Sequence, residues 1–230
     1  MNNKLIVKDV FFDLDHTLWD FDKNSMLAFK RVFKKFKIEI EIESFIEVYE
    51  PINLAYWKKY REEQVTKEIL RRGRLIDSFE KFNIEYSIRK IDEMADSYIE
   101  ELPFDNHLFD GTLAILDYLT VRYQLHIITN GFEEVQYKKL KNSGIYHYFS
   151  TITTSEEVGV KKPNPKVFKM ALKKANANPN QSIMIGDSFE ADILGAKNIG
   201  MNTLFYNYRN EIIPSDFNFI NTLSEIKTHL

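Results

Sequence analysis

Two aspartates separated by one residue stand at the end of an apolar run that begins at Ile6, in the segment DLDHT. Because side chains alternate along a strand, Asp13 and Asp15 can share one face where the strand opens into a loop. Two close carboxylates repel each other unless a cation or a shared proton lies between them. The spacing therefore indicates a cation site or a proton-sharing pair, and about equally an aspartate that only caps a turn.

Three other segments combine side chains capable of chemistry with turn residues. They are Thr129-Asn130-Gly131, Lys161-Lys162-Pro163 and Asp187-Ser188 with Asp192. Taken alone, each is weak evidence, because Asn-Gly is a common turn dipeptide and lysines beside a proline bend are usually solvated. N-capping explains one aspartate of the last segment but hardly both.

The four segments are positioned by an alternation of strand-like and helix-like stretches. Apolar runs typical of buried parallel strands are Ile6 to Asp13, Leu125 to Asn130, Ser182 to Asp187 and Thr203 to Asn207. Helix-like stretches between them are Gly111 to Tyr123, Glu134 to Ser143, Pro165 to Ala175 and Glu190 to Ile199. The alternation predicts an α/β fold with a doubly wound, Rossmann-like parallel sheet. In such sheets ligands bind beyond the carboxyl ends of the strands, where Asp13, Asn130 and Asp187 fall.

Residues 20–105 interrupt this alternation with helical spacing. Apolar side chains recur at helical intervals from Phe29 to Phe36 and from Phe45 to Ile52, and Lys67 to Phe82 and Ser87 to Glu101 are also helix-like. Pro51 is expected to kink or divide the second helix. We therefore expect residues 1–19 and 106–230 to form an α/β core domain and 20–105 an inserted all-helical domain, with the aromatic stripes as its core.

Composition excludes several classes of function. The chain has 230 residues, a formal net charge of -3 and no cysteine, so disulfides and thiolate chemistry are excluded and a metal must be held by oxygen or imidazole. The charge gives no basic field for extended nucleic acid, although a small phosphorylated ligand is compatible with it. No apolar run approaches the roughly 20 residues of a membrane span, and the start shows no cleavage site, so we expect a cytoplasmic protein without membrane attachment.

In their order along the chain, the four segments resemble the four motifs of the haloacid dehalogenase superfamily, specifically its phosphatase branch with a helical cap inserted after the first motif. The resemblance spans Asp13 to Asp192. It implies that Asp13 is a nucleophile that forms an aspartyl-phosphate, and that Asp15 is first general acid and then general base. It also implies a magnesium ion bound by the Asp13 carboxylate, the Asp15 backbone carbonyl and Asp187. Asp192 would contact the residues around the ion rather than the ion itself.

The resemblance assigns the remaining polar positions to the phosphoryl group. The Thr129 hydroxyl and backbone donors near Asn130 and Gly131 would bind its oxygens, and Lys162 would supply positive charge. Lys162 is preferred to Lys161 because the family's lysine immediately precedes the proline. Asp15 favours phosphoryl transfer, since displacement of halide needs no protonated leaving group. His16 stands where glycine is usual and is interpreted as a turn residue.

Shorter segments resemble a bacterial branch of nucleoside 5'-monophosphatases, often described as pyrimidine-preferring. They are Trp19-Asp20-Phe21, Ile52-Asn53 with Trp57, Thr129 to Phe132 with Gln136, and Ser155 to Gly159. A nucleoside monophosphate is therefore the expected substrate, with Trp19 and Trp57 as candidates to stack on the base, although core packing explains Trp57 at least as well. Alternatives are a sugar-phosphate or other small-metabolite phosphatase, a phosphomutase, and a phosphate-sensing regulator without turnover. The sequence does not indicate an oligomeric state.

Overall fold

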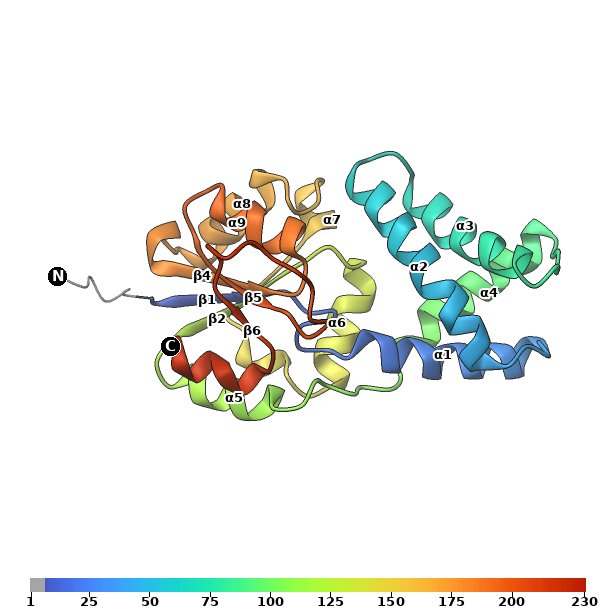
Figure 1. The fold of residues 1–230 in the computed structure, drawn as a ribbon, viewed down its shortest axis with the longest axis horizontal. Coiled ribbons are helices and arrows are strands. Elements are labelled where there is room, and N and C mark those ends of the chain that lie inside the picture. The colour runs from blue at the N-terminus through green and yellow to red at the C-terminus, as the bar shows by residue number, and fades with distance from the viewer. Residues whose placement is uncertain (1–6) are drawn as a thin grey trace. The chain divides into compact units, whose positions relative to one another are not determined.

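The computed structural model, which describes residues 7–230, contains a parallel sheet of six strands (Figure 1). Its strands are β1 (Asp9–Phe12), β2 (Gln124–Thr129), β3 (Thr151–Thr154), β4 (Ser182–Gly186), β5 (Asn202–Tyr206) and β6 (Phe219–Ile220). Their order in the sheet is β3-β2-β1-β4-β5-β6, and all neighbours are parallel. The predicted doubly wound α/β fold is confirmed; Ile6, where the first predicted strand begins, lies outside the described residues.

The register of the sheet brings the predicted site to one edge. Phe12 at the end of β1 pairs with Ile127 of β2 and with Ile185 of β4, so three strands reach their carboxyl ends at the same level. These three side chains are fully buried. Strands covered on both faces need apolar residues at successive positions, which explains the continuous apolar runs in the sequence.

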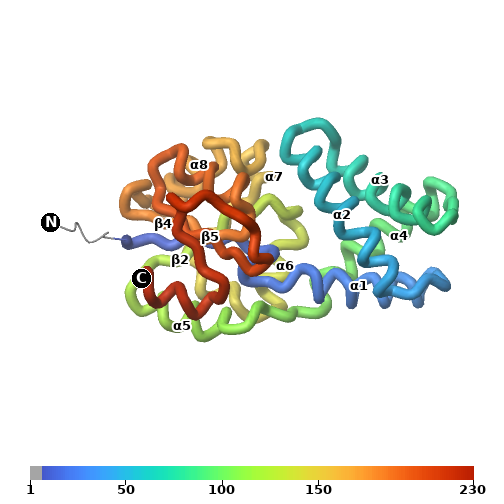
Figure 2. Tube along the Cα trace, viewed as in Figure 1, coloured from blue at the N-terminus to red at the C-terminus, as the bar shows by residue number. Residues whose placement is uncertain are grey.

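Helices cover both faces of this sheet, as the tube in Figure 2 shows for α8 on one side and α5 on the other. The helices of this part are α5 (Thr112–Thr120), α6 (Glu133–Asn142), α7 (Ser155–Val158), α8 (Pro165–Ala175) and α9 (Gly195–Lys197). Short turns of tighter or wider helix are η1 (Tyr146–Tyr148), η2 (Pro179–Gln181), η3 (Phe189–Leu194, a π-helix) and η4 (Leu223–Thr228). The predicted helix Glu190 to Ile199 is therefore a π-helical segment followed by a short α-helix.

A second unit consists of four helices: α1 (Phe21–Phe36), α2 (Ile42–Arg61), α3 (Lys67–Glu80) and α4 (Ile88–Glu101). Thr66 and Ser87 cap the last two, each accepting a backbone N–H three residues on. The aromatic stripe lies inside this unit, where the ring centroid of Phe29 is 4.2 Å from that of Tyr98 and 4.6 Å from that of Tyr49. Pro51 does not divide α2, which runs through it without interruption.

Contacts between backbone segments divide the chain into two compact units. One contains the described residues up to Phe21 together with Asn106–Leu230, and the other contains Asp22–Asp105. The sequence interpretation places the boundaries after residues 19 and 105. Within residues 7–230, no helix is both long and apolar enough to cross a membrane.

Candidate active site

Lys162 and Asp13 form a buried ion pair at the carboxyl edge of the sheet. The Lys162 ammonium donates to Asp13 Oδ1 over 2.6 Å and to the carbonyl oxygen of Ile128 over 2.7 Å. Its Nζ also lies 2.6 Å from Asp192 Oδ1. One ammonium therefore joins the carboxylate that follows β1, a carbonyl of β2 and the carboxylate of Asp192 in η3.

Asn130 fixes the segment that carries this lysine. Its Oδ1 accepts the backbone N–H of Lys162 over 2.8 Å, and its Nδ2 donates to the Lys162 carbonyl over 3.0 Å. The side chain of Asn130 thus ties the end of β2 to the loop before α8. A contribution of its backbone to substrate binding, as expected from the sequence, stays a prediction.

Three carboxylates could together hold a metal ion beside the lysine. One oxygen each of Asp13, Asp187 and Asp192 lie within 4.8 Å of one another. The hydroxyl of Thr17 orients Asp187, because it donates to Oδ1 over 3.2 Å and accepts the Asp187 backbone N–H over 3.1 Å. Asp192 Oδ2 accepts the backbone N–H of Ser188 over 3.1 Å, so this carboxylate is already engaged on both oxygens.

The absence of a side chain at Gly186 permits this close packing of acids. A Cβ added at this position would lie 2.3 Å from Asp192 Oδ2, far inside contact distance. Glycine at the end of β4 therefore lets the carboxylate of Asp192 lie against the backbone and reach the ammonium of Lys162.

Burial, and after it the charges of the neighbouring groups, shifts the pKa values of these residues. Burial raises the pKa of Asp13 to about 7, against the attraction of Lys162 and with a further upward contribution from Asp192. Burial, Asp13 and Asp192 raise the pKa of Asp187 well above its usual value. Burial opposes the charge of Lys162, but Asp13 and Asp192 outweigh it and raise its pKa to about 12.

These residues fit a magnesium ion. Carboxylate oxygens are the ligands that Mg²⁺ prefers, and a divalent cation would relieve the repulsion that adds to burial in raising the pKa values of Asp13 and Asp187. Asp15 belongs to the predicted ligand set through its backbone carbonyl only, and its side chain has other partners.

The carboxylate of Asp15 is bound by two side chains of α6. Lys139 Nζ lies 2.5 Å from Asp15 Oδ1, and Gln136 Nε2 donates to Asp15 Oδ2 over 2.8 Å. In the sequence, Gln136 is noted only as part of the resemblance to nucleotidases, and Lys139 is not singled out. The signal for burial of Lys139 was its position in the helix, on the same face as Val135 and beside Leu140, which are apolar and buried.

Thr129, at the end of β2, is placed to donate a hydrogen bond. Its Oγ1 accepts from Gln136 Nε2 over 3.0 Å and from the backbone N–H of Gly131 over 3.1 Å. Because a hydroxyl has two lone pairs and one proton, two accepted bonds leave the proton for an acceptor. The role of Thr129 as a donor to a phosphoryl oxygen stays a prediction, for which this geometry leaves the hydroxyl proton available.

The two tryptophans are in different surroundings. Trp19 is fully buried, and the ammonium of Lys139 lies 4.0 Å from its ring centroid. Trp57 belongs to the helical unit and is partly exposed, with its ring centroid 5.7 Å from that of Tyr60. Stacking on a base stays a prediction for both, and the packing of Trp19 argues against it there.

His16 has a backbone φ of 63°, in the left-handed region where glycine is favoured. Its ring lies near Tyr208, whose hydroxyl is 3.0 Å from His16 Nδ1. The interpretation of His16 as a turn residue agrees with this conformation.

Residues 10–206 match the family model described as haloacid dehalogenase-like hydrolase. Among curated proteins, the chain is 34% identical to pyrimidine 5'-nucleotidase YjjG of Escherichia coli, with 86% of this chain and 85% of that protein covered. It is 32% identical to pyrimidine 5'-nucleotidase PynA of Streptococcus pneumoniae, with 88% and 85% covered.

Among solved structures, the HAD-hydrolase YfnB of Bacillus subtilis, in a crystal form bound to magnesium, is similar with a TM-score of 0.88. It is 27% identical, and the match covers 96% of this chain and 97% of that one. The resemblance found in the sequence, both to the superfamily and to its nucleotidase branch, is confirmed by these matches. The chain belongs to the haloacid dehalogenase-like hydrolases.

Proposed function

We propose that this protein is a magnesium-dependent phosphatase that hydrolyses small phosphate monoesters through an aspartyl-phosphate on Asp13. The single observation that carries the proposal is the arrangement of Asp15. It stands two residues beyond Asp13, and its carboxylate is held by Gln136 and Lys139 beside the Thr129 hydroxyl. A reaction that expels halide has no use for this acid, whereas the oxygen of a phosphate ester needs a proton to leave.

The reaction proceeds in two steps. In the first, an oxygen of Asp13 attacks phosphorus, the bond from phosphorus to the ester oxygen breaks, and Asp15 gives its proton to the leaving oxygen. In the second, Asp15 takes a proton from water, the water oxygen attacks phosphorus, and the bond from phosphorus to Asp13 breaks. The products are the alcohol and inorganic phosphate, with both aspartates restored.

Positive charge around the phosphoryl group comes from two sources. The carboxylates of Asp13 and Asp187 and the backbone carbonyl of Asp15 would hold Mg²⁺, which supplies charge neutralisation to the phosphoryl oxygens when bound. Lys162 contributes a fixed ammonium 2.6 Å from the nucleophile. Asp192, paired with Lys162, orients this ammonium and does not need to bind the metal.

A nucleoside 5'-monophosphate is the proposed substrate. Support comes from two relatives at 34% and 32% identity that are named pyrimidine 5'-nucleotidases. The four motifs contact only the phosphoryl group, so selection of the alcohol part belongs to other residues, and the helical unit is the candidate. The proposed partner is thus a small phosphorylated metabolite rather than extended nucleic acid.

A turnover screen tests this proposal. Pyrimidine and purine nucleoside monophosphates, sugar phosphates and p-nitrophenyl phosphate would each be assayed with Mg²⁺, with and without a bisphosphate activator. We expect kcat/KM for at least one nucleotide to exceed that for every sugar phosphate by about tenfold or more. Preference for a sugar phosphate would overturn the substrate assignment. A requirement for a bisphosphate would identify a phosphomutase, and binding without turnover a regulator.

A further inference from the structure

Lys139 is a buried cation that the metal site does not use. It is 1% exposed, although its neighbours Lys138 and Lys141 on α6 are exposed. Its ammonium lies 2.5 Å from Asp15 Oδ1, 4.0 Å from the ring centroid of Trp19 and 5.0 Å from that of Phe21. Burying an ammonium is unfavourable unless a negative partner compensates its charge, and Asp15 is such a partner.

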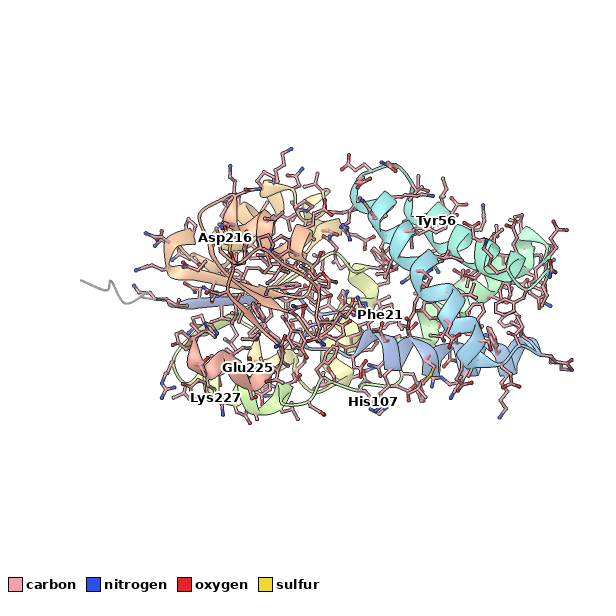
Figure 3. The ribbon with its side chains drawn as sticks, viewed as in Figure 1. Phe21, Tyr56, His107, Asp216, Glu225 and Lys227 are labelled. Atoms are coloured by element: carbon pink, nitrogen blue, oxygen red, sulfur yellow. The ribbon has the colours of Figure 1, made fainter. Side chains whose placement is uncertain are left out.

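The aromatic rings fix the position of this ammonium. Trp19 is joined to the catalytic loop by the hydrogen bond from the His16 backbone N–H to its carbonyl, 3.0 Å long. Phe21, the first residue of α1, is labelled in Figure 3. Both rings lie within the distance at which a cation is attracted to an aromatic face. Trp19 therefore belongs to the group of residues that hold Lys139 next to Asp15.

Gln136 binds the other oxygen of the same carboxylate. Gln136 and Lys139 are three residues apart on α6, so both extend from one face of a single helix. Gln136 reaches Asp15 and Thr129 across the backbone of Gly131, where an added Cβ would lie 1.4 Å from Gln136 Nε2. Both Asp15 oxygens thus have donors on one rigid element.

We propose that Lys139 is a positioning residue, which sets the orientation of the Asp15 carboxylate for both half-reactions, with Gln136 as the second point of attachment. The inference rests on the proposed phosphatase function. Asp15 is repelled by Asp13 and attracted by any cation bound there, so its carboxylate has competing positions. A charge-assisted hydrogen bond to Lys139 favours one of them.

The central experiment compares Lys139→Met with Lys138→Met, which removes an exposed lysine from the same helix. The substrates are a nucleoside monophosphate, whose alkoxide leaving group needs a proton, and p-nitrophenyl phosphate, whose phenolate needs little help. We expect Lys139→Met to lose about tenfold to a hundredfold in kcat/KM for the nucleotide and several-fold less for p-nitrophenyl phosphate. Lys138→Met should match the wild type, and Lys139→Arg should recover most of the loss.

A double-mutant cycle separates positioning from a general effect on packing. If Lys139 acts through Asp15, Lys139→Met should cause little further loss in an Asp15→Asn background. Additive losses, or equal losses on both substrates, would overturn the inference. If a lowered Tm shows that Lys139→Met folds poorly, Gln136→Leu tests the same attachment from the other oxygen and should show the same dependence on the leaving group.

The outcomes also distinguish this inference from the proposed function. Wild-type protein that hydrolyses monoesters, combined with additive losses in the cycle, would overturn the role of Lys139 alone. Wild-type protein without turnover would overturn both. A crystal structure of Lys139→Met gives a readout independent of rate, in which we expect the Asp15 carboxylate to leave its position beside Gln136; an unchanged carboxylate would contradict the inference.

Discussion

Lys162 Nζ and Asp192 Oδ1 lie 2.6 Å apart, and their side chains are 2% and 1% exposed. The same ammonium binds Asp13, the proposed nucleophile, so one buried cation contacts both carboxylates. The sequence places these residues 30 and more positions apart, in separate motifs, and the parallel sheet brings them together because β1, β2 and β4 end at one edge.

Asp13→Asn should lose nearly all turnover, on the order of 10⁴-fold or more, because an amide cannot serve as the covalent nucleophile and only binding and electrostatic terms are left. The measurement is kcat with saturating substrate and Mg²⁺. Mass spectrometry of the acid-quenched wild type should show one phosphoryl adduct that the variant lacks. Near-normal activity in the variant would contradict the aspartyl-phosphate mechanism.

Asp15→Asn should lose less activity with an activated leaving group than with an alkyl ester, because an acidic phenol departs without full protonation. The ratio of kcat/KM between a nucleotide and p-nitrophenyl phosphate measures this selectivity. Equal losses on both substrates would argue against Asp15 as the general acid and for a role in structure or metal binding.

Chelation should abolish activity, Mg²⁺ should restore it and Ca²⁺ should inhibit, because the larger calcium ion takes a looser shell that disturbs in-line geometry. Asp187→Ala should raise the Mg²⁺ concentration needed for half-maximal activity, or abolish activity with the fold retained. Asp216→Ala is the control, since Asp216 lies at the surface of the same unit with 69% of its side chain exposed (Figure 3). Unchanged metal dependence in Asp187→Ala would show that the ligand is assigned wrongly.

The stability of metal-free protein should fall as the pH rises toward and through about 7. Burial raises the pKa of Asp13 from 3.8 to about 7, so the native state binds a proton that the unfolded state has lost in this window. The contribution of Asp13 to the stability of the folded state is full below about pH 4 and is lost as Asp13 ionises. Asp187 has a pKa raised in the same direction.

Thermal unfolding in chelator between pH 5 and 8 measures this effect. The decline in Tm should be shallower in Asp13→Asn, which has no proton to lose at this position, and Mg²⁺ should stabilise the wild type more at pH 8 than at pH 5. A Tm that rises across this range in metal-free wild type, with the same slope in the variant, would contradict the role of these buried acids.

The sequence predicted the strands of the sheet's centre well but not those of its edges. β1, β2, β4 and β5 are apolar runs, whereas β3 is Thr-Ile-Thr-Thr and β6 has two residues, so neither shows a long apolar signal. The helix expected from Glu190 begins as a π-helix in which Asp192 is buried. Its hydrogen bond to the Ser188 N–H and its ion pair with Lys162 are contacts that periodicity does not show.

Three of the four motifs could be recognised in the sequence because each follows a predicted strand, and the lysine motif could be recognised by its proline. Lys139 is harder to distinguish, because a lysine in a helix is usually solvated and only its buried apolar neighbours on α6 indicate otherwise. Three arginines of α3 show the same limit. Arg71 and Arg72 form ion pairs with Asp96 and Asp92. Arg74 is 2% exposed and donates to Asn53 Oδ1 over 2.8 Å, which only the packing of the helical unit reveals.

Trp19 and Trp57 lie in different units of the chain, and we expect their substitutions to have different effects. Trp57 is partly exposed in the helical unit, so it is the better candidate to stack on a nucleobase. Trp57→Ala should reduce kcat/KM for a nucleotide by about tenfold to a hundredfold, the equivalent of roughly 1 to 3 kcal/mol, and leave p-nitrophenyl phosphate nearly unaffected. Trp57→Phe keeps an aromatic face and should retain most of the activity.

Trp19→Ala should behave differently, because its buried ring packs against the ammonium of Lys139. We expect it to resemble Lys139→Met, with a loss of kcat/KM that depends on the leaving group and not on whether the substrate carries a nucleobase. A ribose 5-phosphate control separates the two effects, since it has an alkyl leaving group but no base. Trp19→Ala should slow hydrolysis of the nucleotide and of the sugar phosphate equally, whereas Trp57→Ala should slow only the nucleotide. Parallel losses on all substrates with a lowered Tm in Trp57→Ala would show that this ring only stabilises the helical unit.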